Sequence, residues 1–138
     1  MAITQAVANS FKTEVLTGTH NFTATTGNSF KISLYTNSAT LSKSTTAYTA
    51  SNEVSGTGYT ATGNTLTSVT PVLSSDTAVC DFADTSWTSA TITARGALIY
   101  NDTQSDKAVV VLDFGGDKTS TAGTFTIQFP AADASNAI

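Results

Sequence analysis

His20 is the only histidine in this 138-residue chain, so it is the only residue that could act as the base in a Ser-His-Asp arrangement. It follows a Gly-Thr pair, and no nucleophile-elbow motif occurs anywhere in the chain. Because the chain has sixteen serines, a serine close to this histidine would carry little information. We expect His20 to have a polar surface role or a role in loop packing, and we predict no catalytic residue.

Two pairs of carboxylates could support glycoside hydrolysis, namely Asp81 with Asp84 and Asp113 with Asp117. Such enzymes need a cleft lined with aromatic side chains, and a domain of this size with one tryptophan is poorly equipped for it. The second pair could instead offer loop oxygens to Ca²⁺, but it lacks the ligand number of a calcium loop. Asp and Gly are also the ordinary residues of turns. We therefore predict no metal site, and a small carbohydrate-active enzyme is only a remote alternative.

Two further features are weak signals for chemistry. The pair Gly56 and Gly58 has neither the lysine nor the following helix of a phosphate-binding loop, so we predict no cofactor. Cys80 has no second cysteine to pair with, and it alternates with Val79 and Asp81. This pattern favours a small inward-facing core residue over a reactive thiol.

A helical period is present only at the beginning of the chain. Ile3, Val7, Phe11 and Val15 recur every four residues, which predicts one amphipathic helix over residues 3–16 that ends near Gly18. The N-terminal helical segment thus covers residues 1–18. We expect it to cover an open end of the β core; the alternative is an arm that docks on a partner, and its apolar residues Ile3, Val7 and Phe11 are therefore candidate partner contacts.

Beyond the helical segment the apolar residues follow a period of two, which is typical of strands. Phe30, Ile32 and Leu34 predict a strand with one buried and one wet face. Glycines 56, 58 and 63 delimit two short segments around Tyr59 and Leu66. Further strands are predicted over residues 65–73, 77–82, 90–94, 108–112 and 124–129, and residues 95–100 either extend the strand 90–94 or open a new strand after a glycine bulge. Turns are predicted at 84–87 and 101–106, and a loop at 113–123. About eight strands without βαβ alternation predict one all-β domain over residues 1–138, an antiparallel β-sandwich of jelly-roll type. An immunoglobulin-like sandwich is the alternative.

The predicted core lies in the last two strands. The continuous apolar run 108–112 predicts a central strand covered on both faces, and residues 125, 127 and 129 place three large side chains on one face. We expect the core to contain Val109, Val111, Phe125, Ile127 and Phe129.

The longest predicted loop spans residues 36–52, where Ser, Thr and Asn dominate and Leu41 and Tyr48 are isolated apolar anchors. Long loops in compact domains are uncommon unless they are functional or mobile. We therefore treat Leu41 and Tyr48 as candidate partner contacts, with an inert surface loop as the alternative.

The composition favours a neutral β surface. Twenty-eight residues are threonine and only 12% are charged, so hydroxyl groups must provide much of the solubility. The six basic residues are scattered and the net charge is −4, which argues against direct nucleic-acid binding. No segment has the pattern of a signal peptide or a membrane span. We expect synthesis in a reducing host cytoplasm.

Several stretches resemble those of a family of small structural proteins of tailed bacteriophages: residues 52–60 (NEVSGTGYT), 30–36 (FKISLYT), 90–101 (ATITARGALIYN), 111–118 (VLDFGGDK) and 123–130 (GTFTIQFP). The resemblance implies a virion protein without catalytic residues. Head decoration is the task we expect, in which a β module forms homo-oligomers and cements the capsid lattice from outside by binding the major capsid protein or another virion protein. The alternative is a collar, tail or fibre-associated protein that contacts the host surface.

Overall fold

The computed structural model describes residues 2–135, so Met1 and residues 136–138 of the predicted domain lie outside the described residues. Its elements follow the order β1 (Ala6–Val7), α1 (Asn9–Leu16), β2 (Phe30–Tyr35), β3 (Asn64–Thr65), β4 (Ser68–Ser74), β5 (Thr77–Phe82), β6 (Thr85–Asn101), the 3-10 helix η1 (Asp102–Gln104) and β7 (Lys107–Ile127). The prediction of an antiparallel β-sandwich with a short N-terminal helix is confirmed. None of the helices in the described part of the chain has the length and hydrophobicity needed to span a membrane.

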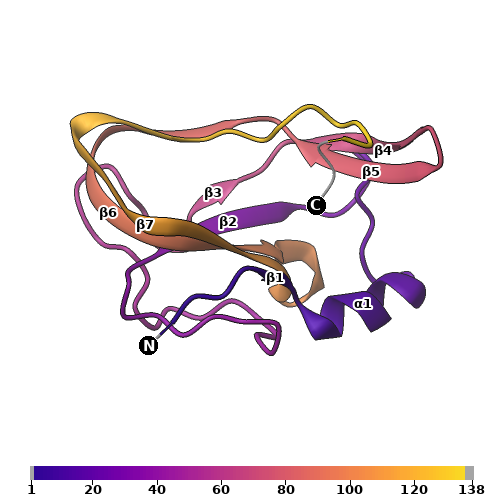
Figure 1. The fold of residues 1–138 in the computed structure, drawn as a ribbon, viewed down its shortest axis with the longest axis horizontal. Helices are drawn as coiled ribbons and strands as arrows, with labels where there is room; N and C mark the ends of the chain where they lie inside the picture. Colours follow the sequence, from indigo (N-terminus) through magenta and orange to yellow (C-terminus); the bar gives the residue numbers. More distant parts are fainter. Residues whose placement is uncertain (1, 136–138) are drawn as a thin grey trace.

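One five-stranded sheet carries the strand order β1-β7-β6-β2-β3, and β4 and β5 form a separate two-stranded sheet. All the strand pairs are antiparallel. The seven strands found among residues 2–135, in this order, do not confirm the jelly roll, which has eight strands in two sheets. Figure 1 shows how the second layer arises: β6 and β7 bend together at one end of the molecule and return across the sheet towards β4 and β5.

The bend of the β6–β7 hairpin corrects two predictions. The predicted loop 113–123 belongs to β7, and the predicted turn 84–87 lies almost wholly in β6. Turn-forming residues occur there because the ladder contains bulges: a single residue of β6, Arg95, faces four residues of β7. Gly115 allows this insertion because its φ of +76° is a conformation that side chains with a Cβ rarely adopt.

Apolar side chains bury both faces of the main sheet. Between the sheet and the returning hairpin lies a first core that includes Phe30, Ile32 and Trp87. On the opposite face lies a second core, made of Ile3, Ala8, Tyr35, Ala39, Leu41, Leu98, Tyr100, Ala108 and Val111. Every residue of β2 except Lys31 is therefore buried, and the prediction of one wet face for this strand is wrong. The N-terminal residues and the long connection from β2 to β3 provide the missing cover.

The N-terminal segment is only partly helical, so the predicted helix over residues 3–16 is corrected. Ile3 forms a parallel bridge with Leu41, β1 pairs with β7, and α1 begins at Asn9. Ile3, Thr4 and Val7 are β-branched residues with modest helix propensity. Their backbone finds partners elsewhere: residues 3 and 4 pair with Leu41, and residues 6 and 7 pair with the edge of β7. The amide of Ala8 continues this pairing by donating to the Val109 carbonyl at 2.9 Å.

The predicted core is confirmed for Val109, Val111 and Phe125, which are buried, whereas Ile127 and Phe129 are only partly buried. Val109 and Val111 lie on opposite faces of the sheet, in the first and second core respectively. A register shift between Ile99 and Tyr100 of β6 explains this, because it leaves Val109 as an extra residue on β7. The prediction that residues 108–112 are covered on both faces agrees with this placement.

Candidate functional site

The five candidate partner contacts lie in three different environments. Ile3 and Leu41 are 7% and 1% exposed and pair with each other, so they are core residues and cannot form a surface. Tyr48 is half-buried in a polar cluster described below. Val7 and Phe11 both line a pocket at the end of the molecule that carries α1 and the β4–β5 hairpin.

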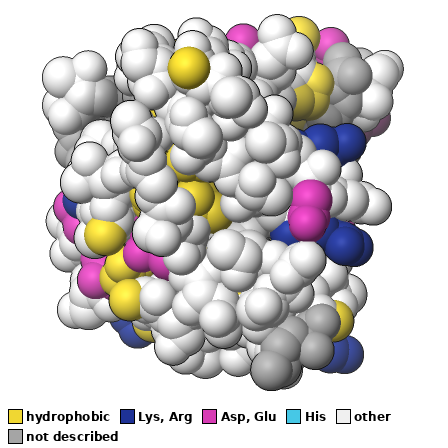
Figure 2. Space-filling view, turned by 90° about the vertical axis from the view of Figure 1, so that its left-hand side faces the viewer, with side chains coloured by type: hydrophobic (Ala, Val, Ile, Leu, Met, Phe, Trp, Pro, Cys, Tyr) yellow, Lys and Arg dark blue, Asp and Glu magenta, His cyan; other side chains and the backbone are white. Residues whose placement is uncertain are grey.

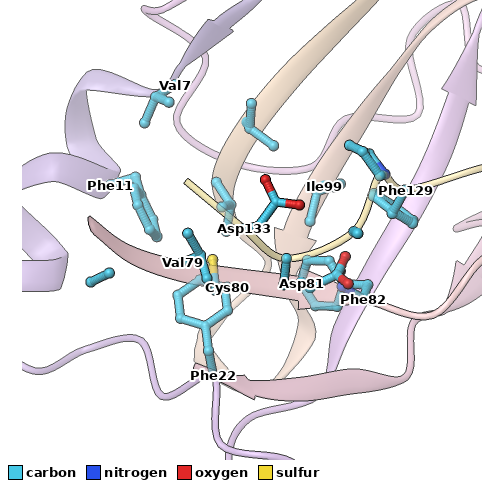
Figure 3. Close-up of a pocket in the computed structure, with 16 residues that line it drawn as sticks. Val7, Phe11, Phe22, Val79, Cys80, Asp81, Phe82, Ile99, Phe129 and Asp133 are labelled. Atoms are coloured by element: carbon cyan, nitrogen blue, oxygen red, sulfur yellow. Dashed lines mark hydrogen bonds between the residues drawn. The ribbon is translucent and has the colours of Figure 1, made fainter. Parts of the chain in front are cut away.

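This pocket, which we call the end pocket, has a volume of about 220 Å³. Figure 3 shows that Val7 and Phe11 approach it from one side while β5 forms the opposite side. The β5 side is formed by the consecutive residues 78–82, and the chain after β7 completes the lining from Phe129 to Asp133. Most of the lining is apolar, and the aromatic rings of Phe22, Phe82 and Phe129 contribute to it.

Exposed apolar side chains continue from the end pocket onto β4. Val72 pairs with Val79, and Leu73 pairs with Ala78, so these two residues of β4 lie beside residues of β5 that line the pocket. Leu73 is 72% exposed and Val72 is 53% exposed. Sequence reasoning did not identify this surface. Its signal was the run from Val69 to Leu73, whose apolar residues lack the strict alternation of a strand with one buried face.

Cys80 also lines the end pocket, and its side chain is exposed. The prediction that Cys80 is an inward core residue is wrong, because Val79 and Phe82 are the buried residues of β5. These two are three residues apart, so the strand does not alternate strictly at this point. The atoms that surround the exposed thiol partly desolvate it and raise the pKa of Cys80, and the negative charge of Asp81 acts in the same direction.

The polar cluster around Tyr48 centres on the carboxylate of Glu53. This residue belongs to the stretch 52–60, one of those that resemble phage structural proteins. Glu53 accepts hydrogen bonds from the hydroxyls of Tyr48 at 2.6 Å and Tyr59 at 2.7 Å, and from the amide of Thr62 at 2.8 Å. The hydroxyl of Tyr59 in turn accepts from the amide of Leu34 in β2, at 3.0 Å. This cluster therefore ties the long connection to the main sheet and has a structural role.

His20 is buried between α1 and the sheet. Its Nδ1 atom lies 3.0 Å from Nδ2 of Asn101, and its Nε2 atom lies 3.7 Å from a carboxylate oxygen of Glu14. Lys107 pairs with the same Glu14 oxygen at 3.2 Å. Burial is the largest cause that lowers the pKa of His20 from its ordinary value of 6.5; Glu14 opposes this effect and Lys107 adds to it. Of the two roles predicted for His20, this position agrees with loop packing.

The predicted carboxylate pairs bind separate partners. Asp113 accepts from Nε of Arg95 at 3.1 Å and from the amide of Gly115 at 2.9 Å, and these bonds lower its pKa. Asp117 accepts instead from the side chain of Asn37 at 3.3 Å. Likewise, Asp81 accepts from the amide of Phe82 and Asp84 from the amide of Phe129, both at 2.8 Å. Within residues 2–135 there is no cluster of three or more His, Cys, Asp or Glu side chains arranged to hold a metal ion.

Comparison of the chain with models of protein families, with curated proteins and with solved structures finds no match.

Proposed function

We propose that this chain is a structural protein of a tailed-phage virion that binds the outside of the capsid lattice as a decoration protein. The sequence stretches that resemble small phage structural proteins support the virion assignment. Three of these five stretches have structural roles in this fold. Residues 90–101 and 111–118 belong to the bent β6–β7 hairpin, and residues 52–60 contain Glu53, which holds the long connection to the main sheet.

The observation that carries the proposal is the outer face of the β6–β7 hairpin. Residues 85–94 and 119–128 contain no charged side chain, and they present a row of exposed hydroxyls from Ser86, Thr88, Thr91, Thr93, Thr119, Thr121, Thr124 and Thr126. Hydroxyls of facing strands pair: Ser86 with Thr126 and Thr93 with Thr119, each at 2.9 Å. Figure 2 views the end where this hairpin bends: white atoms, which belong to uncharged polar side chains and backbone, cover most of it, and acidic and basic side chains lie on either side.

A neutral hydroxyl surface is suited to a repeated protein interface. Full charges are costly to strip of water at an interface, whereas hydroxyls lose less and can pair with backbone groups of a partner. A capsid repeats the same contact many times, so a weak contact per copy can give firm retention of an oligomer.

The test is to mix the purified protein with capsids that lack it, at low and at high ionic strength, and to count the bound copies per particle. We expect hundreds of copies and little effect of salt. Thr124→Asp, which places a charge on the outer face, should lower the copy number, whereas Thr13→Asp on the exposed side of α1 is the matched control and should not.

Binding of a dozen or fewer copies at the tail vertex would replace decoration with the collar, tail or fibre alternative. Absence of binding to every virion component would contradict both assignments.

A further inference from the structure

The size and lining of the end pocket suit one apolar side chain. Its lining is largely aromatic and aliphatic, and about 220 Å³ is enough to accept a Leu, Met or Phe side chain but is below the usual size of a site for a drug-sized ligand. The exposed Val72, which pairs with Val79 of the lining and so shares its face, extends the apolar surface beyond the pocket, whereas Leu73 points to the other face of the hairpin. If a partner inserts an apolar side chain into the end pocket, the residues next to that side chain in the partner would therefore contact β4.

The charge around the pocket is negative. Asp81 and Asp133 belong to the lining, which contains no lysine or arginine. The chain from residue 44 to residue 94, which supplies the whole β4–β5 hairpin, has no basic residue at all, and it carries Asp76 in the turn between the two strands. A partner segment that approaches the end pocket along the β4–β5 hairpin is thus favoured when it carries positive charge.

We propose that the end pocket binds an apolar side chain of a partner protein that has lysine or arginine directly beside that side chain. The apolar group fills the space between Phe11 and Phe82, and the flanking cations meet the carboxylate of Asp81. Insertion of Leu73 from a second copy is the competing arrangement. It is disfavoured because Asp76 of the incoming hairpin would approach Asp81 with the same charge. The proposal rests on the pocket and does not require the virion assignment.

Three capped pentapeptides test the proposal: Gly-Lys-Leu-Lys-Gly, its glutamate counterpart Gly-Glu-Leu-Glu-Gly, and Gly-Lys-Gly-Lys-Gly without the anchor. Each is titrated into ¹⁵N-labelled protein at low salt, and amide shifts are followed by NMR. We expect the lysine-flanked leucine peptide to shift amides of Val79 and Phe82 and to bind at least about fivefold more tightly than the other two. Added salt should reduce this difference, because screening weakens exposed charge pairs.

Two protein changes locate the site. Asp81→Asn should remove most of the preference for lysine over glutamate, whereas Asp102→Asn, outside the pocket lining, should keep it. Because Cys80 is the single cysteine, a bulky maleimide attached to it should block binding without any substitution in the core. The control is the double variant Cys80→Ala with Thr121→Cys, which carries the same label on the exposed β7 face and should bind normally.

Equal affinity for the lysine and glutamate peptides, or shifts confined to other surfaces, would overturn the proposal. So would the absence of any shift at millimolar peptide. Concentration-dependent dimerisation that the Cys80 label abolishes would assign the pocket to a second copy and overturn it as well. Failure to bind capsids leaves each of these results unchanged, so the two proposals can fail independently.

Discussion

The Nδ1 atom of His20 accepts a hydrogen bond from the side-chain amide of Asn101 across 3.0 Å. The direction of this bond is fixed because the Asn101 oxygen is already engaged by the amides of Thr103 and Gln104, which orients its nitrogen towards the ring. A neutral His20 therefore carries its proton on Nε2, facing Glu14 at 3.7 Å. A proton on Nδ1 would face a donor and break this bond.

We therefore expect folding stability to fall as the pH is lowered from about 7.5 to about 5.5. The folded pKa of His20 lies below the unfolded value of 6.5, so the unfolded chain binds more protons in this range and is stabilised relative to the folded state. Urea denaturation at several pH values measures the slope. His20→Gln should flatten it, and an unchanged slope in this variant would show that other groups are responsible.

Replacing Glu53 with Gln should lower the free energy of unfolding by about 1–3 kcal/mol. The change keeps the size of the side chain but removes the charge that accepts from Tyr48, Tyr59 and Thr62. Urea denaturation measures the effect, with the exposed Asp102→Asn as control. A double-mutant cycle with Tyr48→Phe should be non-additive; additive losses would mean that the two groups act independently.

Sequence periodicity predicted most of the strands but not the places where the chain leaves strict periodicity. Residues four apart share one face in a helix and also in a strand, so the spacing of Ile3, Val7 and Phe11 could not separate the two. Pairing of Ile3 with Leu41 and of Val7 with β7 decided it, and both contacts are distant in sequence. Similarly, Gly115 marks a bulge within a strand and not a loop, because turn-forming residues serve both purposes.

The end pocket could not be predicted for the same reason. Phe11, Phe82 and Phe129 come from three segments that are far apart in the chain, and no local pattern states that they meet. Asp81 was considered only as half of a carboxylate pair with Asp84, whereas the fold gives each carboxylate a different backbone amide.

Gly63→Ala should destabilise the protein by about 1–3 kcal/mol or more. Gly63 has a φ of +78°, and a Cβ at this position would overlap the carbonyl oxygen of Ile32 in β2. Gly116→Ala is the matched control, because it has open space around the added carbon and no positive φ. Thermal unfolding of both variants compares them. Equal midpoints would show that the chain near Gly63 relaxes without cost.

Truncation of two isoleucines should separate the centre of the first core from its margin. Ile32→Ala should cost about 2–5 kcal/mol, because Ile32 is fully buried in the central part of the sheet. Ile127→Ala should cost less, because Ile127 is only partly buried near the end of β7. Denaturant titration gives both values, and a larger loss for Ile127 would mean that the end of β7 carries more of the packing than its burial indicates.

Cys80 should behave as an accessible thiol and not as a core residue. Because its side chain is exposed, a disulfide reagent such as dithiodipyridine should modify one thiol per folded chain, without denaturant. The raised pKa of the thiol means that the modification rate should still be increasing at the ordinary cysteine value of 9.0. Cys80→Ala should change the free energy of unfolding by no more than about 0.5 kcal/mol. If the thiol reacts only after unfolding, and if Cys80→Ala lowers the free energy of unfolding by more than about 1 kcal/mol, Cys80 is a core residue after all.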